Sequence, residues 1–254
     1  MERSVVAVSG SRGFLGEHLI QRLSSEKVIR LDRSGEVPYC NTVIDLAGYG
    51  NLYGQNDISE IYKANLTRVI KSVENAGGAK YIYVSTSSVK LPFQTPYSLS
   101  KKASEEFLQS IGKKIAIVRP FTIIGTGEQE EHLIPKLIQS CLYGTEIPFV
   151  SDPVHDFCDV DDFVDALLTV KDKGLFRGEI YEVGSGRQTS NDEVRLLVED
   201  ITGNKANIRP VESLRNYDTK DWVANNERIC SLGWKPKVSL EQGIKRMIEV
   251  YEKN

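Results

Sequence analysis

Tyr97 and Lys101 stand four residues apart in the segment TPYSLSKKASEEFL, residues 95–108. On a helix, two side chains at this spacing share one face, one turn apart. A free tyrosine is a poor proton acceptor because its pKa is roughly 10, and a nearby lysine cation lowers that pKa. The pair could therefore supply the proton transfer needed to oxidise an alcohol or reduce a ketone. The alternative is an amphipathic surface helix in which this common spacing is incidental.

The residues around this pair carry the signals of a helix. Thr95 suits an N-cap, and Pro96 suits the first helical turn. Apolar residues then recur at helical spacing, at Ala103, Phe107, Leu108 and Ile111. We therefore expect a helix that starts near Thr95 and runs to about residue 111.

The first residues predict a binding site for the phosphates of a dinucleotide. A β-branched apolar run at residues 4–9 predicts a buried parallel strand, and a helix is predicted at residues 16–25. Between them lies the pattern G-x-x-G-x-x-G, at Gly10, Gly13 and Gly16. Glycines let the backbone approach a pyrophosphate, which sits at the positive end of the helix dipole. The order strand, glycine turn, helix is more specific than the glycine spacing alone.

Asp32 follows a second predicted strand, at residues 28–31. An acid about 20 residues past the glycines can accept hydrogen bonds from both ribose hydroxyls of an adenosine and repels a 2′-phosphate. This favours NAD over NADP. Arg33 stands next to it and softens that preference, so NADP stays possible. The alternative is a tight turn with a solvent-exposed Asp.

Strands and helices alternate through the first half of the chain. Further strands are predicted at residues 42–46, 81–84 and 114–118, with a long helix at residues 58–76. This alternation predicts an α/β fold of the Rossmann type, with a doubly wound parallel sheet. The gap between the second and third strands, residues 34–41, is too short for another helix and strand. We therefore expect a sheet that is trimmed at that edge.

Beyond about residue 120 the pattern loosens, which predicts a small C-terminal substrate-binding lobe. We expect residues 1–120 to form the NAD(P)-binding domain, with a strand and a helix returning to it from about residues 155–185. Residues 121–254 then form mostly the lobe. A hydroxyl cluster, Ser85 to Ser88, follows the strand at residues 81–84, where open α/β sheets bind ligands. Alternatively, the cluster is only a polar loop or a helix cap.

Composition excludes several classes of function. The 254 residues carry a formal net charge of −3 without a basic run, so we expect no nucleic-acid partner. The four cysteines are far apart and form no C-x-x-C, so no metal site is expected and a reducing compartment fits best. We find no signal-peptide pattern and no apolar stretch near 18 residues. A cytoplasmic protein without a membrane segment is expected.

Taken in order, ten short motifs resemble the extended short-chain dehydrogenase/reductase family. The resemblance is to its NAD-dependent epimerase/dehydratase branch, which acts on nucleotide-diphosphate sugars, and it covers nearly the whole chain. The motifs are GSRGFLG (10–16), LDR (31–33), DLAG (45–48), YKANLTRV (62–69), VSTSSV (84–89), YSLSK (97–101), RPFTIIG (119–125), HDFCDVDDFVDALL (155–168), YEVGSG (181–186) and LGWKP (232–236).

This resemblance implies roles for the residues. Tyr97 is the expected acid/base at a sugar hydroxyl. Lys101 is expected to hold the nicotinamide ribose and to lower the Tyr97 pKa. Thr86 is expected to bond the reacting oxygen, with Ser87 as the fallback. The implied NAD-binding residues are Gly10, Arg12, Gly13, Phe14, Leu15, Gly16, Asp32, Arg33, Leu46, Ala47, Gly48, Asn65, Ser85, Tyr97, Lys101 and Pro120; the implied substrate-binding residues are Ser87, Ser88, Thr122, His132 and His155.

Departures from the family pattern limit the chemistry. The 4,6-dehydratases of the family carry Asp-Glu straight after the active Thr, where this chain has Ser87 and Ser88. The 3,5-epimerase-reductases that make GDP-fucose have a Cys where Ser88 stands. An unactivated serine is a poor base for a carbon acid, so both chemistries are disfavoured. What remains is hydride transfer at one carbon, C4, by a 4-epimerase or a 4-keto-reductase, and Asp32 favours NAD and hence the epimerase.

Other departures concern the sugar and its nucleotide, neither of which the sequence identifies. His132 opens a predicted helix and is interpreted as a cap or a substrate contact rather than a catalytic residue. His155 replaces the usual Arg of R-D-F, and Thr122 replaces the usual Asn of R-P-x-N. Only ten residues lie between Thr86 and Tyr97. This short segment predicts a more open sugar site, lined by Lys90, Leu91 and Phe93.

Two rival functions share this fold. The first is a non-catalytic NAD(P)-sensing regulator, which has no need of Tyr97, Lys101 and Thr86 together. The second is a nucleic-acid-associated protein, which the acidic charge balance disfavours. By resemblance we also expect a homodimer, with the helices at residues 58–76 and 97–111 forming a four-helix interface.

Overall fold

The computed structural model describes residues 4–52, 54–112, 114–212 and 221–253. The chain divides into two compact units, each described by itself. Unit 1 comprises Met1–Pro120, Val164–Val183 and Glu227–Trp234. Unit 2 comprises Phe121–Phe163, Gly184–Asn226 and Lys235–Asn254.

Unit 1 contains a six-stranded sheet in which every pairing is parallel, which confirms the predicted α/β class. The strand order β2-β1-β3-β4-β5-β9 reverses direction between β1 and β3, so the carboxyl ends of these two strands form the switch point where such sheets bind ligands. β2 is the edge strand, as the short gap after it predicts. The strands are β1 (Val5–Ser9), β2 (Lys27–Arg30), β3 (Thr42–Asp45), β4 (Lys80–Val84), β5 (Ile115–Pro120) and β9 (Arg177–Val183).

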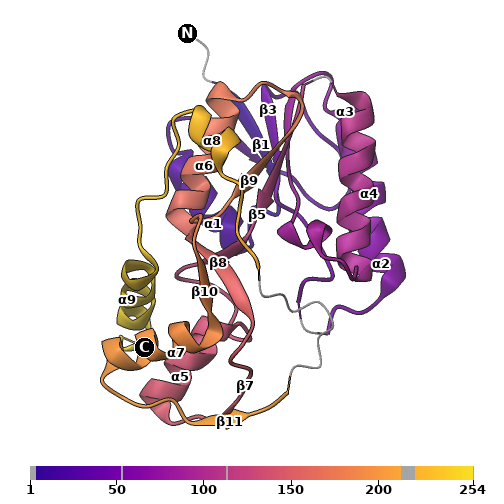
Figure 1. Cartoon of the computed structure of the whole chain (residues 1–254). Helices are drawn as coiled ribbons and strands as arrows, with labels where there is room; N and C mark the ends of the chain where they lie inside the picture. Colours follow the sequence, from indigo (N-terminus) through magenta and orange to yellow (C-terminus); the bar gives the residue numbers. More distant parts are fainter. Residues whose placement is uncertain (1–3, 53, 113, 213–220, 254) are drawn as a thin grey trace. The chain divides into compact units, whose positions relative to one another are not determined.

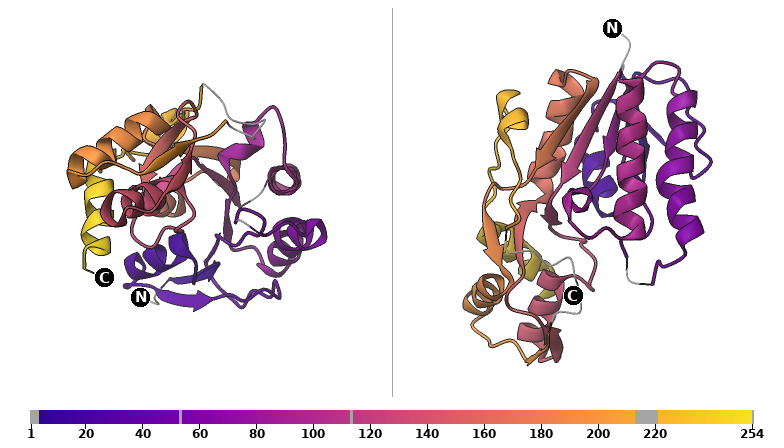
Figure 2. Two further views of the ribbon diagram at one scale, coloured as in Figure 1. Left: turned by 90° about the horizontal axis from the view of Figure 1, so that it is seen from below. Right: turned by 45° about the vertical axis from the view of Figure 1, so that its right-hand side comes forward.

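Helices cover both faces of this sheet (Figures 1 and 2). One face carries α3 (Arg68–Asn75) and α4 (Pro96–Ile111), and the other carries α1 (Phe14–Arg22) and the part of α6 (Val160–Lys173) that belongs to unit 1. An ion pair between Arg22 and Asp165 joins α1 to α6. The short α8 (Glu227–Ser231) also belongs to unit 1.

The single helix predicted at residues 58–76 is interrupted. It consists of α2 (Ile58–Tyr62), a π-helical turn η1 (Lys63–Thr67) and α3. Asp57 caps its start by accepting a hydrogen bond from the Glu60 N–H. Apolar periodicity cannot distinguish one π turn from an α turn, so the sequence did not predict this break.

The core of unit 1 forms because the strands are apolar on both faces. Ala7, Val43, Ile117 and Leu108 of α4 are completely buried. Two tyrosines of β4, Tyr81 and Tyr83, pack into the same cluster and bring hydroxyl groups into it.

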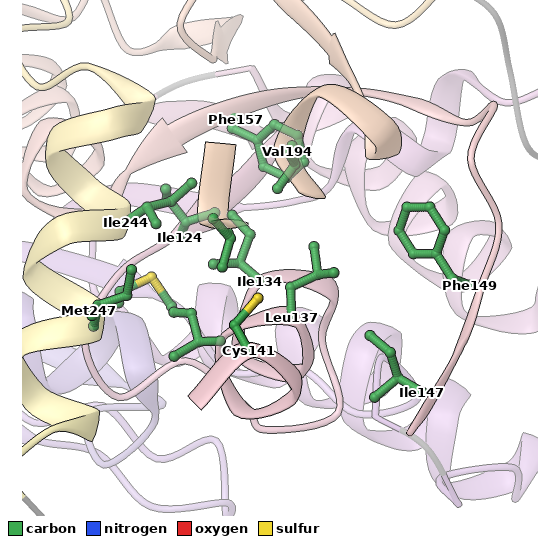
Figure 3. Close-up of a cluster of buried hydrophobic side chains, with 13 residues drawn as sticks. Ile124, Ile134, Leu137, Cys141, Ile147, Phe149, Phe157, Val194, Ile244 and Met247 are labelled. Carbon is green, nitrogen blue, oxygen red and sulfur yellow. The ribbon is translucent and has the colours of Figure 1, made fainter. Parts of the chain in front are cut away.

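Unit 2 has its own core around three helices, α5 (Leu133–Tyr143), α7 (Asn191–Thr202) and α9 (Leu240–Tyr251). In Figure 3, Ile244 and Met247 of α9 point toward Ile124 and toward α5. Short strands complete the unit: β6 (Thr122–Ile124), β8 (Val154–Asp159) and β10 (Gln188–Ser190) form one sheet, and β7 (Ile147–Phe149) and β11 (Ile208–Pro210) form another. Four of these five strands have three residues, too few to show an alternating pattern.

The turn between β1 and α1 depends on two glycines. Gly10 has a φ of +67°, and a Cβ there would lie 2.8 Å from the Ala47 nitrogen. A Cβ on Gly16 would lie 2.2 Å from the Gly10 carbonyl oxygen. Both contacts are with backbone atoms, which a rotamer change cannot move. The turn therefore requires glycine at both positions.

Gly16→Ala is therefore expected to lower the free energy of unfolding by about 3 kcal/mol, because its methyl group overlaps backbone atoms. Gly13→Ala is the matched control: Gly13 has a φ of −87°, and its Cβ would meet only the Gly10 oxygen, at 3.4 Å. It should cost about 1 kcal/mol or less. Urea unfolding measures both values, and equal stability of the two variants would contradict the close approach.

Candidate active site

Arg30, at the end of β2, holds the glycine turn from the side. It donates a hydrogen bond of 2.9 Å to the Ser11 carbonyl and lies 3.5 Å from the Glu17 carboxylate. Gly13 is the N-cap of α1 and provides no side-chain cap, so the first amides of the helix point outward without one. The sequence motif did not reveal Arg30, because its contact depends on β2 pairing with β1.

Asp32 lies just past the end of β2 and is exposed. Its Oδ1 accepts hydrogen bonds from the Ser34 hydroxyl, at 2.6 Å, and from the Ser34 N–H, at 2.8 Å. These bonds lower the pKa of Asp32. The carboxylate is therefore an ionised acceptor at neutral pH, next to the exposed Arg33.

The turn after β3, Leu46 to Gly48, meets the glycine turn. Asp45, at its start, is completely buried and accepts hydrogen bonds from Arg68, at 2.9 and 3.1 Å, and from the Tyr81 hydroxyl, at 2.6 Å. Burial opposes the charge of Asp45, but the Arg68 cation and these bonds hold its pKa below the usual value. The ion pair therefore persists inside the unit.

Asn65, in the π turn η1, links this region to the helix of Tyr97. The Asn65 side chain accepts a hydrogen bond from the Tyr49 N–H at 2.9 Å and donates one to the Tyr49 carbonyl at 2.8 Å. The Asn65 amide also donates to the Ser100 hydroxyl, at 2.9 Å, and Ser100 donates to the Tyr97 carbonyl, at 2.7 Å. Asn65 is thus fully occupied in holding backbone in place.

Tyr97 lies in the first turn of α4, whose start the sequence predicts correctly. Thr95 is the N-cap, Pro96 is the first residue, and Thr95 and Ser98 form a capping box. Across from it, the Thr86 hydroxyl accepts from the Ser88 N–H at 3.2 Å. Its own hydrogen bond to Tyr97 favours the phenolate. The structure therefore brings together Thr86 and Tyr97, the residues expected to act on one oxygen.

The pKa of Tyr97 differs from the sequence-based expectation. We expected Lys101 to lower it, but burial raises the pKa of Tyr97 to about 12, and only the hydrogen bond from Thr86 opposes that rise. The prediction of a lowered pKa is thus wrong for the chain itself. Tyr97 as a whole residue is half-buried, but the loss of hydration around its phenolate raises the pKa by more than one hydrogen bond lowers it.

Lys101 is 2% exposed, one helical turn after Tyr97. Its ammonium donates to the Val84 carbonyl at 2.8 Å and lies 4.5 Å from the centre of the Tyr83 ring. Burial lowers the pKa of Lys101 to about 8. A Cβ on Gly48 would lie 3.8 Å from the ammonium, so Lys101 reaches the turn after β3.

The hydroxyl cluster after β4 divides into separate environments. The buried Ser85 Oγ has no hydrogen-bond partner in the described part of the chain. Ser87 and Ser88 start the short helix η2 (Ser87–Lys90), Ser87 buried and Ser88 partly exposed. Pro120 ends β5. These residues all belong to unit 1, with Tyr97 and Lys101.

The other proposed substrate contacts lie in unit 2. Thr122 and His155 contact each other at 3.4 Å, between Oγ1 and Nδ1. His132 occupies the N-cap position of α5 without capping it by its side chain, which contacts Glu128 at 2.9 Å instead. Burial raises the pKa of Glu128, and His132 opposes that rise. Sequence reasoning did not single out Glu128.

Two negative findings apply to the described residues only. Within them, no group of three or more His, Cys, Asp or Glu side chains could hold a metal ion. None of the helices described is long and apolar enough to cross a membrane. The four cysteines are free.

Known proteins resemble this chain both in sequence and in structure. dTDP-D-glucose 4,6-dehydratase of Mus musculus is 27% identical over 325 residues, which cover 98% of this chain and 89% of that protein. The structure of MoeE5 in complex with UDP-glucose and NAD matches with a TM-score of 0.87 at 21% identity, over 98% of both chains. UDP-glucose 4-epimerase of Thermotoga maritima with UDP-glucose matches with a TM-score of 0.86 at 22% identity, over 98% of this chain and 99% of that one.

At 21% and 22% identity, the two solved structures support the fold of this chain and nothing beyond it. The sequence model of the NAD dependent epimerase/dehydratase family matches residues 36–184, more than half of the chain. That match includes the Thr86, Tyr97 and Lys101 region and leaves the glycine turn outside. This chain belongs to the NAD-dependent epimerase/dehydratase family.

Proposed function

We propose that this protein is an NAD-dependent enzyme that acts on a nucleotide-diphosphate sugar and inverts the configuration at C4 by transient oxidation. The observation that carries the proposal is the position of Tyr97 on α4, one helical turn before the buried Lys101, where the Thr86 hydroxyl lowers the Tyr97 pKa against the effect of burial. A non-catalytic sensor has no use for a phenol poised against a second hydroxyl. MoeE5 and the Thermotoga maritima epimerase both form complexes with UDP-glucose, which supports this substrate class.

The residues of unit 1 fit a dinucleotide. The N-terminus of α1 has no side-chain cap, and a Cβ on Gly13 would meet only one atom, so the turn leaves room for a pyrophosphate. The buried, unpartnered Ser85 Oγ offers a further polar contact. We assign the cofactor to the glycine turn, Asp32 and Arg33, the turn Leu46–Gly48, Ser85, Lys101 and Pro120. Asn65 acts through the backbone it holds.

The residues then share the reaction as follows. Tyr97 takes the proton from the C4 hydroxyl and later returns it. Thr86 donates a hydrogen bond to the oxygen that carries the negative charge. Lys101 binds the ribose hydroxyls of the cofactor. When bound, NAD supplies the hydride acceptor and donor and a positive charge that brings the Tyr97 pKa down from about 12.

A 4,6-dehydration fits this site poorly. Removing a proton at C5 and expelling water from C6 needs a base and an acid, and the positions after Thr86 are Ser87 and Ser88. Both serines lie in η2, and the Ser88 N–H is engaged by Thr86. Although the mouse relative is named a dehydratase, this chain lacks the carboxyl groups for that step at these positions.

The second candidate is a 4-keto-sugar-nucleotide reductase that consumes NADPH. The observation in its favour is at Asp32, where Oδ1 already accepts two hydrogen bonds from Ser34 and Arg33 stands adjacent. An arginine at this place suits a 2′-phosphate. Epimerase and reductase need the same Tyr97 chemistry, so they differ only in which substrate and cofactor the protein accepts.

Two further parts of the proposal concern binding. Ser87 and Ser88 of unit 1 contact the substrate. A homodimer forms through α2, α3 and α4, since α2 and α4 expose Ile58 (58%), Leu99 (43%) and Ile111 (40%).

Tyr97→Phe is expected to lower turnover of UDP-glucose about 1000-fold, because it removes the proton-transfer group. NADH binding, measured by fluorescence titration, should change less than about threefold, since phenylalanine keeps the ring and the other expected cofactor residues are unchanged. The matched control is Tyr39→Phe, which removes the hydroxyl of an exposed tyrosine (87%). Wild-type turnover in Tyr97→Phe would contradict the assignment.

UDP-glucose deuterated at C4 separates the candidate reactions. An epimerase removes the deuterium and returns it to the opposite face, so UDP-galactose with deuterium at C4 is expected by NMR. Deuterium recovered at C6 of a 4-keto-6-deoxy sugar would establish a dehydratase instead. No reaction of UDP-glucose, together with oxidation of NADPH by a 4-keto sugar nucleotide, would establish the reductase.

A further inference from the structure

A buried ion pair lies directly below the turn after β3. The side chains of Asp45 and Arg68 are 0% and 8% exposed, with their closest charged atoms 2.9 Å apart. Ser9 and Tyr81 also donate hydrogen bonds to Asp45. Burying two charges is costly, and an apolar pair of similar volume is often no less stable. Stability alone therefore does not explain this pair.

The pair holds both backbone polar groups of one residue, Ala47. Asp45 Oδ1 accepts from the Ala47 N–H at 3.2 Å, and Arg68 Nη2 donates to the Ala47 carbonyl at 3.4 Å. Ala47 is also the residue against which Gly10 closes. Asp45 and Arg68 thus fix the turn Leu46–Gly48 at the switch point, where the proposed cofactor binds.

The same pair faces Lys101. The charged groups that act on the Lys101 ammonium are Asp45 on β3, Arg68 on α3 and Glu105 on α4, and the Tyr83 ring of β4 packs against it. Glu105 is already neutralised by Arg119, through hydrogen bonds of 2.9 and 3.2 Å. Asp45 favours the ammonium, whereas Arg68 disfavours it, so the two charges act on the Lys101 pKa in opposite directions.

We propose that Asp45 and Arg68 are positioning residues of the active site, which hold the turn Leu46–Gly48, beside the Lys101 ammonium, in the shape that the cofactor needs. The part that concerns Lys101 and the cofactor rests on the function proposed above. Neither side chain touches the substrate. The π turn η1 directly precedes Arg68, which begins α3 and reaches the Ala47 carbonyl.

Substitutions of Asp45 and Arg68 have different expected effects if the pair is only structural and if it positions the active site. Breaking either partner leaves the other charge buried and lowers stability in both cases. For Lys101 the two substitutions act in opposite directions. Asp45→Asn leaves the Arg68 cation unopposed and lowers the Lys101 pKa below about 8, whereas Arg68→Met leaves the Asp45 carboxylate unopposed and raises it above about 8.

The experiment is an NMR titration of the protein labelled with ¹³C at lysine Cε, in which Lys101→Met identifies the Lys101 signal. It compares wild type, Asp45→Asn, Arg68→Met and the double variant. Opposite shifts in the single variants and an intermediate value in the double variant are expected. NADH binding should weaken about fivefold to tenfold in each single variant, because the turn loses one anchor.

The control is Arg195→Met, which breaks a comparable pair with Glu199 in unit 2 and should leave Lys101 and NADH binding unchanged. Shifts of the Lys101 pKa in the same direction, or none, would overturn the proposal. If Arg68→Met does not fold, Asp45→Asn decides alone, since only a lowered pKa agrees. The titration needs no substrate, so its result is separate from whether Tyr97→Phe abolishes turnover.

Discussion

The close approach of Gly10 to Ala47 is the contact on which the rest of the site depends. Parallel pairing of β1 with β3 sends their carboxyl ends to one edge of the sheet, and a side chain at Gly10 would collide with the Ala47 backbone. Because this space is filled by backbone, the glycine turn and the turn after β3 form one surface. The proposed cofactor site, the Asp45–Arg68 pair and Lys101 all meet there.

Burial of charge is the second constraint. The same packing that excludes water raises the pKa of Tyr97 to about 12 and lowers that of Lys101 to about 8. Both shifts disfavour the charged forms. A charge placed beside these two groups should shift their pKa values strongly, because little water remains to screen it. Shifted pKa values of this kind cluster at functional sites.

Local signals in the sequence predicted much of this structure. Strand, glycine turn and helix, the cap at Thr95 and the edge position of β2 each depend on a few neighbouring residues, and each was predicted correctly. Thr86, which the family resemblance joined with Tyr97 to one reacting oxygen, lowers the Tyr97 pKa, and their shared role in catalysis stays a prediction. The spacing of Tyr97 and Lys101 alone did not distinguish a catalytic pair from an incidental one on a surface helix.

What the sequence did not predict depends on contacts between distant residues. Arg68 lies 23 residues from Asp45, and nothing local marks it as the partner of a buried carboxylate. The π turn leaves the apolar pattern intact, and the strands of three residues are too short to show one. The predicted direction of the Tyr97 pKa shift was wrong, because the shift depends on how much water the fold removes from around the phenol.

The central claim is that Tyr97 is the group that exchanges a proton, once a positive charge lies beside it. The most direct measurement is the pKa of Tyr97 by NMR of the protein labelled with ¹³C at tyrosine Cζ, without and with saturating NAD⁺. The expected pKa of Tyr97 is about 12 for the chain alone and clearly lower with NAD⁺. An unchanged pKa in the presence of bound NAD⁺ would contradict it.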